Sequence, residues 1–132
     1  MADDQTQVSE FKSRSGLKRV FAAFFYSLEG LRMAWKSEHA FRQELMVVVP
    51  CTVIALLLPI VSVEKLALIA VLVLVLIVEL INSAIEAAID RISFERHQLS
   101  KNAKDFGSAA VFLACGLAIA TWTVILLPLL HH

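Results

Sequence analysis

Three long segments of the chain are free of charge or nearly so, and short polar stretches separate them. The first runs from Leu45 to Val63, the second from Leu66 to about Ile89, and the third from Gly107 to about Leu130. A bilayer core about 30 Å thick needs roughly 20 apolar residues in a helix. Each segment meets that length. When the residues that flank these segments are included, the pattern predicts three membrane-spanning helices at about 38–61, 63–90 and 100–130.

The N-terminal part of the chain has a different pattern. Residues 1–15 are polar and predict a disordered tail, whereas residues 17–36 repeat large apolar side chains at helical spacing. Basic residues flank that apolar face, which predicts an amphipathic helix in the membrane interface or packed against the spans. Serines stand where the N-caps of the three spans are expected, at Ser37, Ser62 and Ser100.

Composition supports a membrane protein of one domain covering residues 1–132. The chain is 58% hydrophobic and only 18% charged, whereas soluble proteins carry about 25% charged residues. The basic residues gather before residue 45 and between Arg91 and Lys104. The positive-inside rule therefore predicts that the N-terminus and the link between the second and third spans are cytoplasmic, with the C-terminus outside.

The second span carries a stripe of polar side chains. Glu79, Asn82, Glu86 and Asp90 share an arc of about 80° on a helix, and Glu86 lies about 10 Å beyond Glu79 toward the cytoplasm. A carboxylate at membrane depth costs about 2.5 kcal/mol or more. The stripe therefore faces other protein, binds a cation, or forms a hydrogen-bonded seam with protonated glutamates. Clustered carboxylates near the interface suit Mg²⁺.

Two further charged clusters flank this stripe, one from Glu38 to Glu44 and one at Lys104-Asp105. With the predicted topology all three lie at one membrane level. They would supply acids for a metal, cations for phosphate and a buried base, which phosphoryl transfer needs. The four glycines are too scattered for a P-loop or a GxGxxG motif. A small proton- or cation-coupled transporter remains an alternative from another class.

The segment from Glu79 to Glu86, ELINSAIE, closely resembles the signature of the prokaryotic diacylglycerol kinase family, E-x-x-N-[ST]-A-[IL]-E. FRQE at 41–44 and AKDFGSAA at 103–110 also resemble that family, and the resemblance covers roughly residues 17–126. It implies an all-α homotrimer in the bacterial inner membrane, with three spans and a surface helix per subunit and active sites shared between subunits. The implied reaction is ATP-dependent phosphorylation of diacylglycerol to phosphatidic acid. Undecaprenol kinase, a relative with the same chemistry, is the nearest alternative.

The resemblance also implies residue roles. Glu79 matches the general base, Glu38 and Glu86 match ligands of Mg²⁺, and Asn82 lies between base and metal. The residues that match nucleotide contacts are Arg19, Tyr26, Glu38, Glu86, Glu95, His97, Lys104 and Asp105. The residues that match positions near the lipid are Arg19, Arg42, Gln43, Glu44, Glu79 and Ser108.

Overall fold

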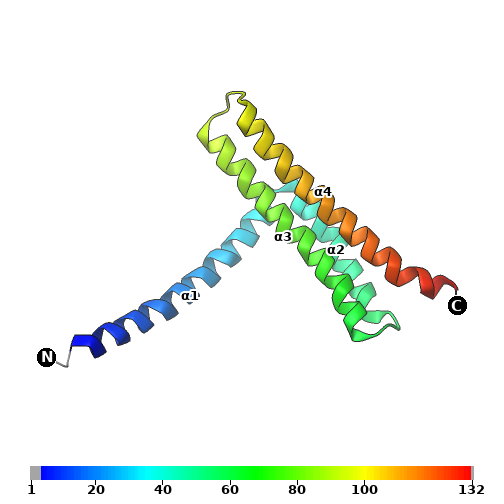
Figure 1. Cartoon of the computed structure of the whole chain (residues 1–132), viewed down its shortest axis with the longest axis horizontal. Helices are drawn as coiled ribbons and strands as arrows, with labels where there is room; N and C mark the ends of the chain where they lie inside the picture. Colours follow the sequence, from blue (N-terminus) through cyan, green and yellow to red (C-terminus); the bar gives the residue numbers. More distant parts are fainter. Residues whose placement is uncertain (1–3, 132) are drawn as a thin grey trace. The chain divides into compact units, whose positions relative to one another are not determined.

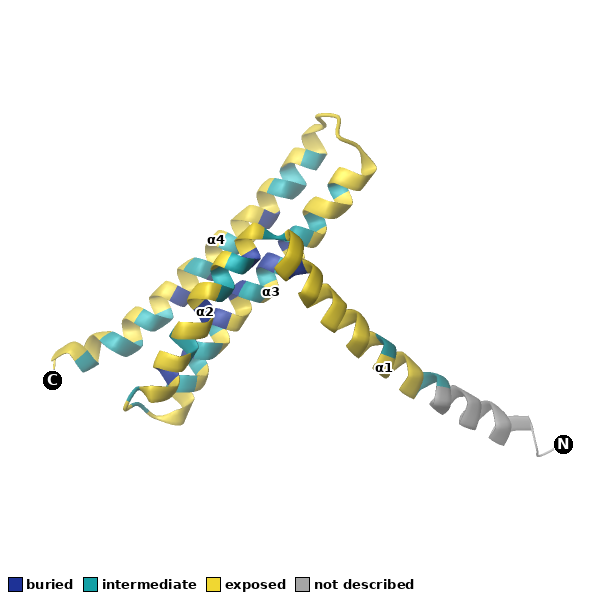
Figure 2. Ribbon diagram, turned by 180° about the vertical axis from the view of Figure 1, so that it is seen from behind, coloured by how far each residue is buried: buried dark blue, intermediate teal, exposed yellow. Residues whose placement is uncertain are grey.

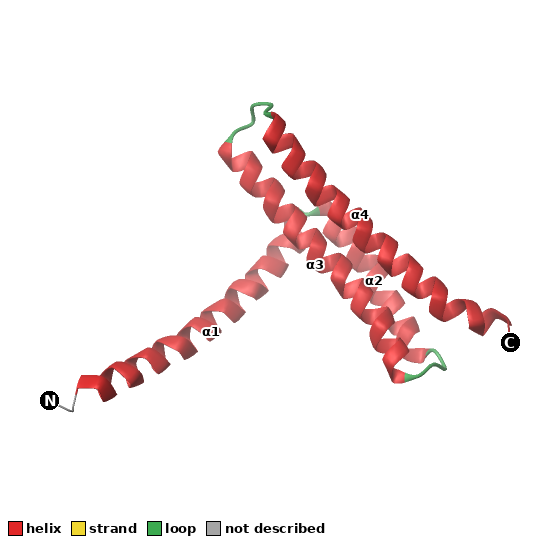
Figure 3. Cartoon of the chain, in the orientation of Figure 1, coloured by secondary structure: helices red, strands yellow, loops and turns green. Residues whose placement is uncertain are grey.

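The computed structural model describes residues 4–131, with side chains from residue 15 onward, and its ordered elements are all helical. These elements are α1 (Asp4–Ser37), α2 (His39–Leu57), α3 (Ser62–Ile92), α4 (Gln98–Leu126) and a terminal 3-10 turn, η1 (Leu127–His131) (Figure 1). Within residues 4–131 there is no strand (Figure 3). Three helical segments are long and apolar enough to cross a membrane, which confirms the predicted all-α fold with three spans.

The chain divides into two units, Met1–Ser37 and Glu38–His132. In the first unit, α1 begins at Asp4, earlier than the expected start at Leu17, and residues 1–3 of the expected tail lie outside the described residues. From residue 15 onward, the large apolar side chains of α1 are exposed, among them Phe24 and Phe25, whose rings meet edge-on with centroids 6.0 Å apart. An exposed apolar face on a basic helix is typical of an interfacial helix. Its position at the membrane surface stays a prediction.

In the second unit, α3 packs against both α2 and α4. The buried positions of α3 recur every three or four residues, so they form one stripe along the helix. They are Leu68, Leu72, Val75, Glu79 and Asn82. Figure 2 shows the buried positions of α2, α3 and α4 gathered along the inside of the bundle, while most outward positions are exposed. Extensive exposed apolar surface is expected of helices that face lipid.

Contacts between α3 and α4 follow an antiparallel register. Val75 packs with Ala114 and Ala118 in the apolar core. Toward the end that carries η1, Trp122 Nε1 donates a hydrogen bond to the Leu68 carbonyl at 3.2 Å. Toward the α3–α4 loop, Lys104 pairs with Asp90. The two helices are therefore held together along most of their length, by apolar contacts in the middle and by a polar contact toward each end.

The helix starts differ from the three predicted serine caps, which were wrong. The N-cap residues are Glu38, Val61 and His97. Ser37 is the last residue of α1, and its hydroxyl donates to the Met33 carbonyl at 2.7 Å. A serine within a helical turn commonly bonds back in this way. Ser62 and Ser100 lie inside their helices, and the His97 ring takes the capping role at α4 by accepting from the Leu99 N–H at 3.2 Å.

Candidate functional site

Two polar side chains interrupt the apolar stripe of α3. Glu79 is 5% exposed and Asn82 is 9% exposed, although both belong to a helix able to span a membrane. Polar groups inside a membrane are costly and usually mark functional sites. The same helical spacing that buries Leu68 and Leu72 buries these two residues. Their burial therefore follows from the helical spacing of the stripe, and they differ from its other members in being polar.

Asn82 packs against the backbone of α4 at Gly107. A Cβ added at residue 107 would overlap the amide oxygen of Asn82 and lie 3.3 Å from its Cγ, so only glycine fits there without movement. The same amide oxygen, Asn82 Oδ1, is buried and has no hydrogen-bond partner within the described part of the chain. Sequence reasoning missed this contact, because the small residues that it noted lie on the second span. Leaving a buried acceptor unpaired costs free energy, so this oxygen is available to a hydrogen-bond donor.

Three other carboxylates lie within electrostatic range of Glu79. Glu79 interacts with Glu86 on the same helix and with Glu38, the N-cap residue of α2. Glu44, one turn and a half further along α2, interacts with Glu79 and has a buried oxygen, Oε2, that lacks a hydrogen-bond partner in the described region. Like charges at such range repel each other, so the cluster favours a bound cation or proton.

The carboxylate cluster suits a metal ion that the protein and a substrate bind jointly. Among the side chains of residues 15–131, no group of three or more His, Cys, Asp or Glu is placed to hold a metal ion by itself. Mg²⁺, however, is usually bound through one or two carboxylates together with substrate phosphates and water. Glu38 and Glu86 each lie within electrostatic range of Glu79, so two carboxylates, the number that Mg²⁺ usually takes from protein, are available to an ion that arrives with a phosphorylated substrate.

A cavity of about 660 Å³ opens beside the α3–α4 loop. Four of the predicted nucleotide contacts, Glu95, His97, Lys104 and Asp105, line this cavity, which we call the loop cavity. Its volume falls in the range of about 300–1,000 Å³ typical of small-molecule sites. The structure therefore brings these four residues together at one site, although their separate roles stay predictions.

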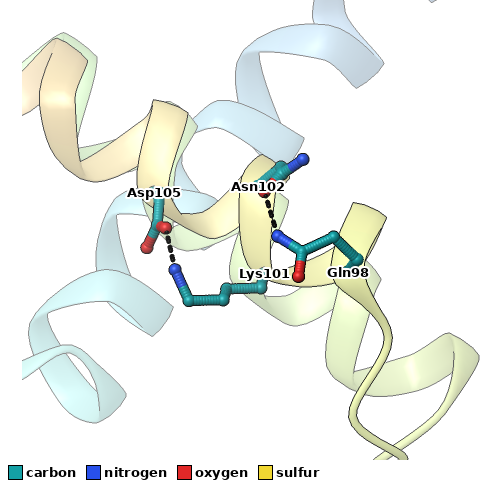
Figure 4. A network of polar contacts seen from close by, with 4 residues as sticks. All are labelled: Gln98, Lys101, Asn102 and Asp105. Carbon is teal, nitrogen blue, oxygen red and sulfur yellow. Dashed lines mark hydrogen bonds and ion pairs between the residues drawn. The ribbon is translucent and has the colours of Figure 1, made fainter.

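Ion pairs hold the side chains of Lys101 and Lys104 in place beside the loop cavity. Lys104 Nζ lies 2.6 Å from Asp90 Oδ1, which joins the second turn of α4 to the last turn of α3. Lys101 pairs with Asp105 at 2.6 Å, and Gln98 donates to Asn102 at 2.8 Å, both within α4 (Figure 4). Lys104 also interacts with Glu86. Glu86 is therefore within electrostatic range both of Lys104 at the loop cavity and of Glu79.

A second cavity, of about 540 Å³, is almost wholly apolar and lies among α2, α3 and α4. Gln43 and Glu44 are its polar residues near the carboxylate cluster, and Cys51, Leu72 and Trp122 are among its apolar ones. We call it the span cavity. Along α3, the span cavity is lined by Leu72 and Val75, which precede Glu79, whereas the loop cavity is lined by Ile89 and Asp90, which follow it. Glu79 is therefore placed between an apolar and a polar site.

The remaining predicted residues are less closely tied to this arrangement. Arg42 lies on the first turns of α2, where its Nη2 is 3.4 Å from His39 Nδ1, and Ser108 is exposed on α4 directly after Gly107. Arg19 and Tyr26 lie exposed on α1, which is a separate unit, so their contacts with the site stay predictions.

Comparison with known proteins gives consistent matches. The family model described as prokaryotic diacylglycerol kinase matches residues 25–126. The chain is 52% identical over 119 residues to the diacylglycerol kinase of Pseudomonas aeruginosa, a match that covers 90% of this chain and 97% of the relative. It is 48% identical over 112 residues to that of Escherichia coli K12, covering 85% and 92% of the two chains. The diacylglycerol kinase of Haemophilus influenzae is 40% identical over 118 residues, covering 85% and 95%.

Proposed function

The chain belongs to the prokaryotic diacylglycerol kinase family, and we propose that it transfers the terminal phosphate of ATP to the free hydroxyl of diacylglycerol. The product would be phosphatidic acid, formed at the cytoplasmic face of a bacterial inner membrane. The observation that carries this proposal is the position of the buried carboxylate of Glu79. Glu79 is within electrostatic range of Glu44, which lines the apolar span cavity, and of Glu86, which is itself within range of Lys104 in the polar loop cavity.

In the proposed reaction, Glu79 accepts the proton of the lipid hydroxyl. The hydroxyl oxygen then bonds to the terminal phosphorus of ATP, the bond from that phosphorus to the bridging oxygen breaks, and ADP leaves. A positioned general base contributes about 10²–10⁴-fold to a rate. The unpartnered amide oxygen of Asn82, one turn from Glu79, is available to accept a hydrogen bond from a substrate group.

Glu38 and Glu86 would hold Mg²⁺ together with the phosphates of ATP. The bound ion would neutralise charge on the transferring phosphate, as in other phosphoryl-transfer enzymes. The side chains of Lys104 and His97 would contact the nucleotide in the loop cavity, along with Glu95 and Asp105. Arg19 and Tyr26 of the surface helix would complete that contact set.

On the lipid side, Gln43 and Glu44 lie where the span cavity meets the carboxylate cluster, which suits a glycerol head above buried acyl chains. Arg42, Ser108 and Arg19 complete the proposed lipid contacts. We also propose a homotrimer with active sites shared between subunits, with the N-terminus and the α3–α4 loop cytoplasmic and the C-terminus periplasmic. The basic residues of the loop, Arg91 to Lys104, support that orientation.

The direct test uses purified protein in mixed micelles with diacylglycerol, Mg²⁺ and labelled ATP. Labelled phosphatidic acid should form, its formation should stop when the divalent ion is chelated, and Glu38→Gln and Glu86→Gln should each remove most of the activity. Undecaprenol presented in the same micelles should be the poorer substrate. Faster turnover of undecaprenol would assign the chain to that lipid, and no phosphorylation of either lipid by folded protein would overturn the proposal.

A further inference from the structure

One aromatic side chain at the loop cavity has no role in the proposed reaction. Phe94 lies in the loop between α3 and α4 and lines the loop cavity, yet it is 92% exposed. A phenyl ring left in water forgoes the hydrophobic gain of burial, so a ligand surface that covers it gains free energy. The neighbouring residues Glu95 and Arg96 are also exposed and charged, which favours a loop in water.

The backbone on both sides of Phe94 is fixed by local hydrogen bonds. The Ser93 hydroxyl accepts from the Glu95 N–H at 3.0 Å, which closes a turn around Phe94. Ser93 N–H donates to the Ile89 carbonyl at 3.3 Å, so the turn is anchored to the end of α3. On the other side, His97 caps α4. The ring is therefore presented from a short, braced loop, and ordering it on a ligand costs little entropy.

Different kinds of side chain also line different parts of the loop cavity. Phe94 stands at the loop end, and Lys104 lies on the second turn of α4, beside Asp90 and within electrostatic range of Glu86. Glu86 is about 9 Å before Ile92, the end of α3. An aromatic surface at the loop, with a cation and carboxylates further along the helices, matches a nucleoside triphosphate, whose base and terminal phosphate are at opposite ends.

We propose that Phe94 stacks on the base of the nucleotide and thereby sets a preference for purine triphosphates. This inference rests on the proposed function and adds a specificity-determining residue to it. Bases stack on aromatic side chains without needing hydrogen-bond readout, and the strength of stacking varies with the base. A purine offers the larger surface. The preference should therefore appear in the KM for the nucleotide and leave the chemical step unchanged.

The test compares Phe94→Ala and Phe94→Trp with the parent protein, using ATP and CTP as donors at saturating diacylglycerol. Phe94→Ala should raise the KM for ATP about fivefold, at the lower end of the range for base stacking because the ring is so exposed. It should leave kcat unchanged and bring the KM values for ATP and CTP together. Phe94→Trp should keep the preference for ATP. Phe112→Ala is the matched control, because Phe112 is an exposed phenylalanine of α4 that does not line the loop cavity.

A fluorescence measurement separates stacking from membrane insertion of the loop. The emission that Phe94→Trp adds to that of the parent should change with ATP and should not be quenched by brominated lipids. Quenching by those lipids without a response to ATP would overturn the inference in favour of a membrane anchor. An unchanged ratio of KM values for ATP and CTP in Phe94→Ala would also overturn it. Absence of phosphatidic acid with the parent protein would instead count against the proposed function.

Discussion

The two halves of the buried stripe on α3 have the same geometry and opposite chemistry. Leu68, Leu72 and Val75 form the first half, and Glu79 and Asn82 form the second, with all five buried at helical spacing. In the first half α4 contributes alanines and a tryptophan that donates to a backbone carbonyl. In the second half a buried amide oxygen has no partner in the described region, and carboxylates approach one another.

The difference indicates how a small membrane protein accommodates a reactive site. The apolar half gains stability from packing, while each carboxylate at membrane depth costs about 2.5 kcal/mol or more. Such local conflict is expected at functional sites, where stability is given up for chemistry. The predictions below alter one half at a time, and they run from the largest expected effect to the smallest.

The largest effect is expected at the polar half, from Glu79→Gln. If Glu79 is the general base, turnover should fall by about 10²–10⁴-fold while the protein still folds, because glutamine keeps the shape and removes the proton acceptor. The initial rate of phosphatidic acid formation measures this. Glu64→Gln is the control on the same helix, since Glu64 lies in the first turn of α3, far from the cluster. Near-parental turnover in Glu79→Gln would remove the base assignment.

Overpacking between α3 and α4 should give the next largest effect. Gly107→Ala places a methyl group on the amide of Asn82, which should cost about 1–3 kcal/mol of stability and lower turnover at least about tenfold by displacing that amide. Gly116→Ala is the matched control, because a Cβ there meets no atom within 4 Å. Thermal unfolding in micelles and turnover should be measured for both variants. Equal behaviour of the two would contradict the close contact.

A smaller effect is expected where α3 and α4 are joined by the Lys104–Asp90 ion pair. Exposed ion pairs contribute about 0.2–1 kcal/mol, so Asp90→Asn should raise the KM for ATP by no more than about fivefold, by freeing Lys104 from its position. Asp90→Glu retains the carboxylate and should behave more like the parent. Steady-state kinetics at varied ATP decides this, and a KM that is the same in all three proteins would argue against a positioning role.

The smallest effect is expected in the apolar half, from Trp122→Phe. This change removes the hydrogen bond to the Leu68 carbonyl and should cost about 0.6 kcal/mol, the average for polar contacts between membrane helices. Turnover per folded molecule should stay the same. Unfolding by detergent titration measures the stability. A large loss of turnover at full folding would show that the two halves are not separable.

Much of the fold could be predicted from the sequence, because each span has to satisfy its own backbone and needs a long apolar run. The stripe of Glu79, Asn82 and Glu86 was also visible, since it depends only on spacing within one helix. Contacts between helices could not be predicted from the sequence. The pairing of Asn82 with Gly107 and of Asp90 with Lys104 depends on the register of α3 against α4, which no local pattern encodes.

The helix caps and the candidate site likewise show which features a local sequence pattern predicts and which it does not. His97 was matched to a nucleotide contact by resemblance, and its capping of α4 was missed because an imidazole is a less common cap than serine. The resemblance selected Glu95, His97, Lys104 and Asp105, which proved to line one cavity. It gave no role to Phe94, whose place in that cavity depends on the shape of a five-residue connection between Ile92 and Gln98.

The most direct test of the contrast between the two halves is the stability of Glu79→Met measured beside that of Leu72→Met. Burying a carboxylate beside other carboxylates costs free energy that an apolar side chain of similar shape does not, so Glu79→Met should unfold at a higher temperature than the parent while losing turnover. Leu72→Met should change stability by less than about 1.5 kcal/mol and keep turnover. A Glu79→Met protein that is less stable than the parent, or that retains turnover, would contradict the account.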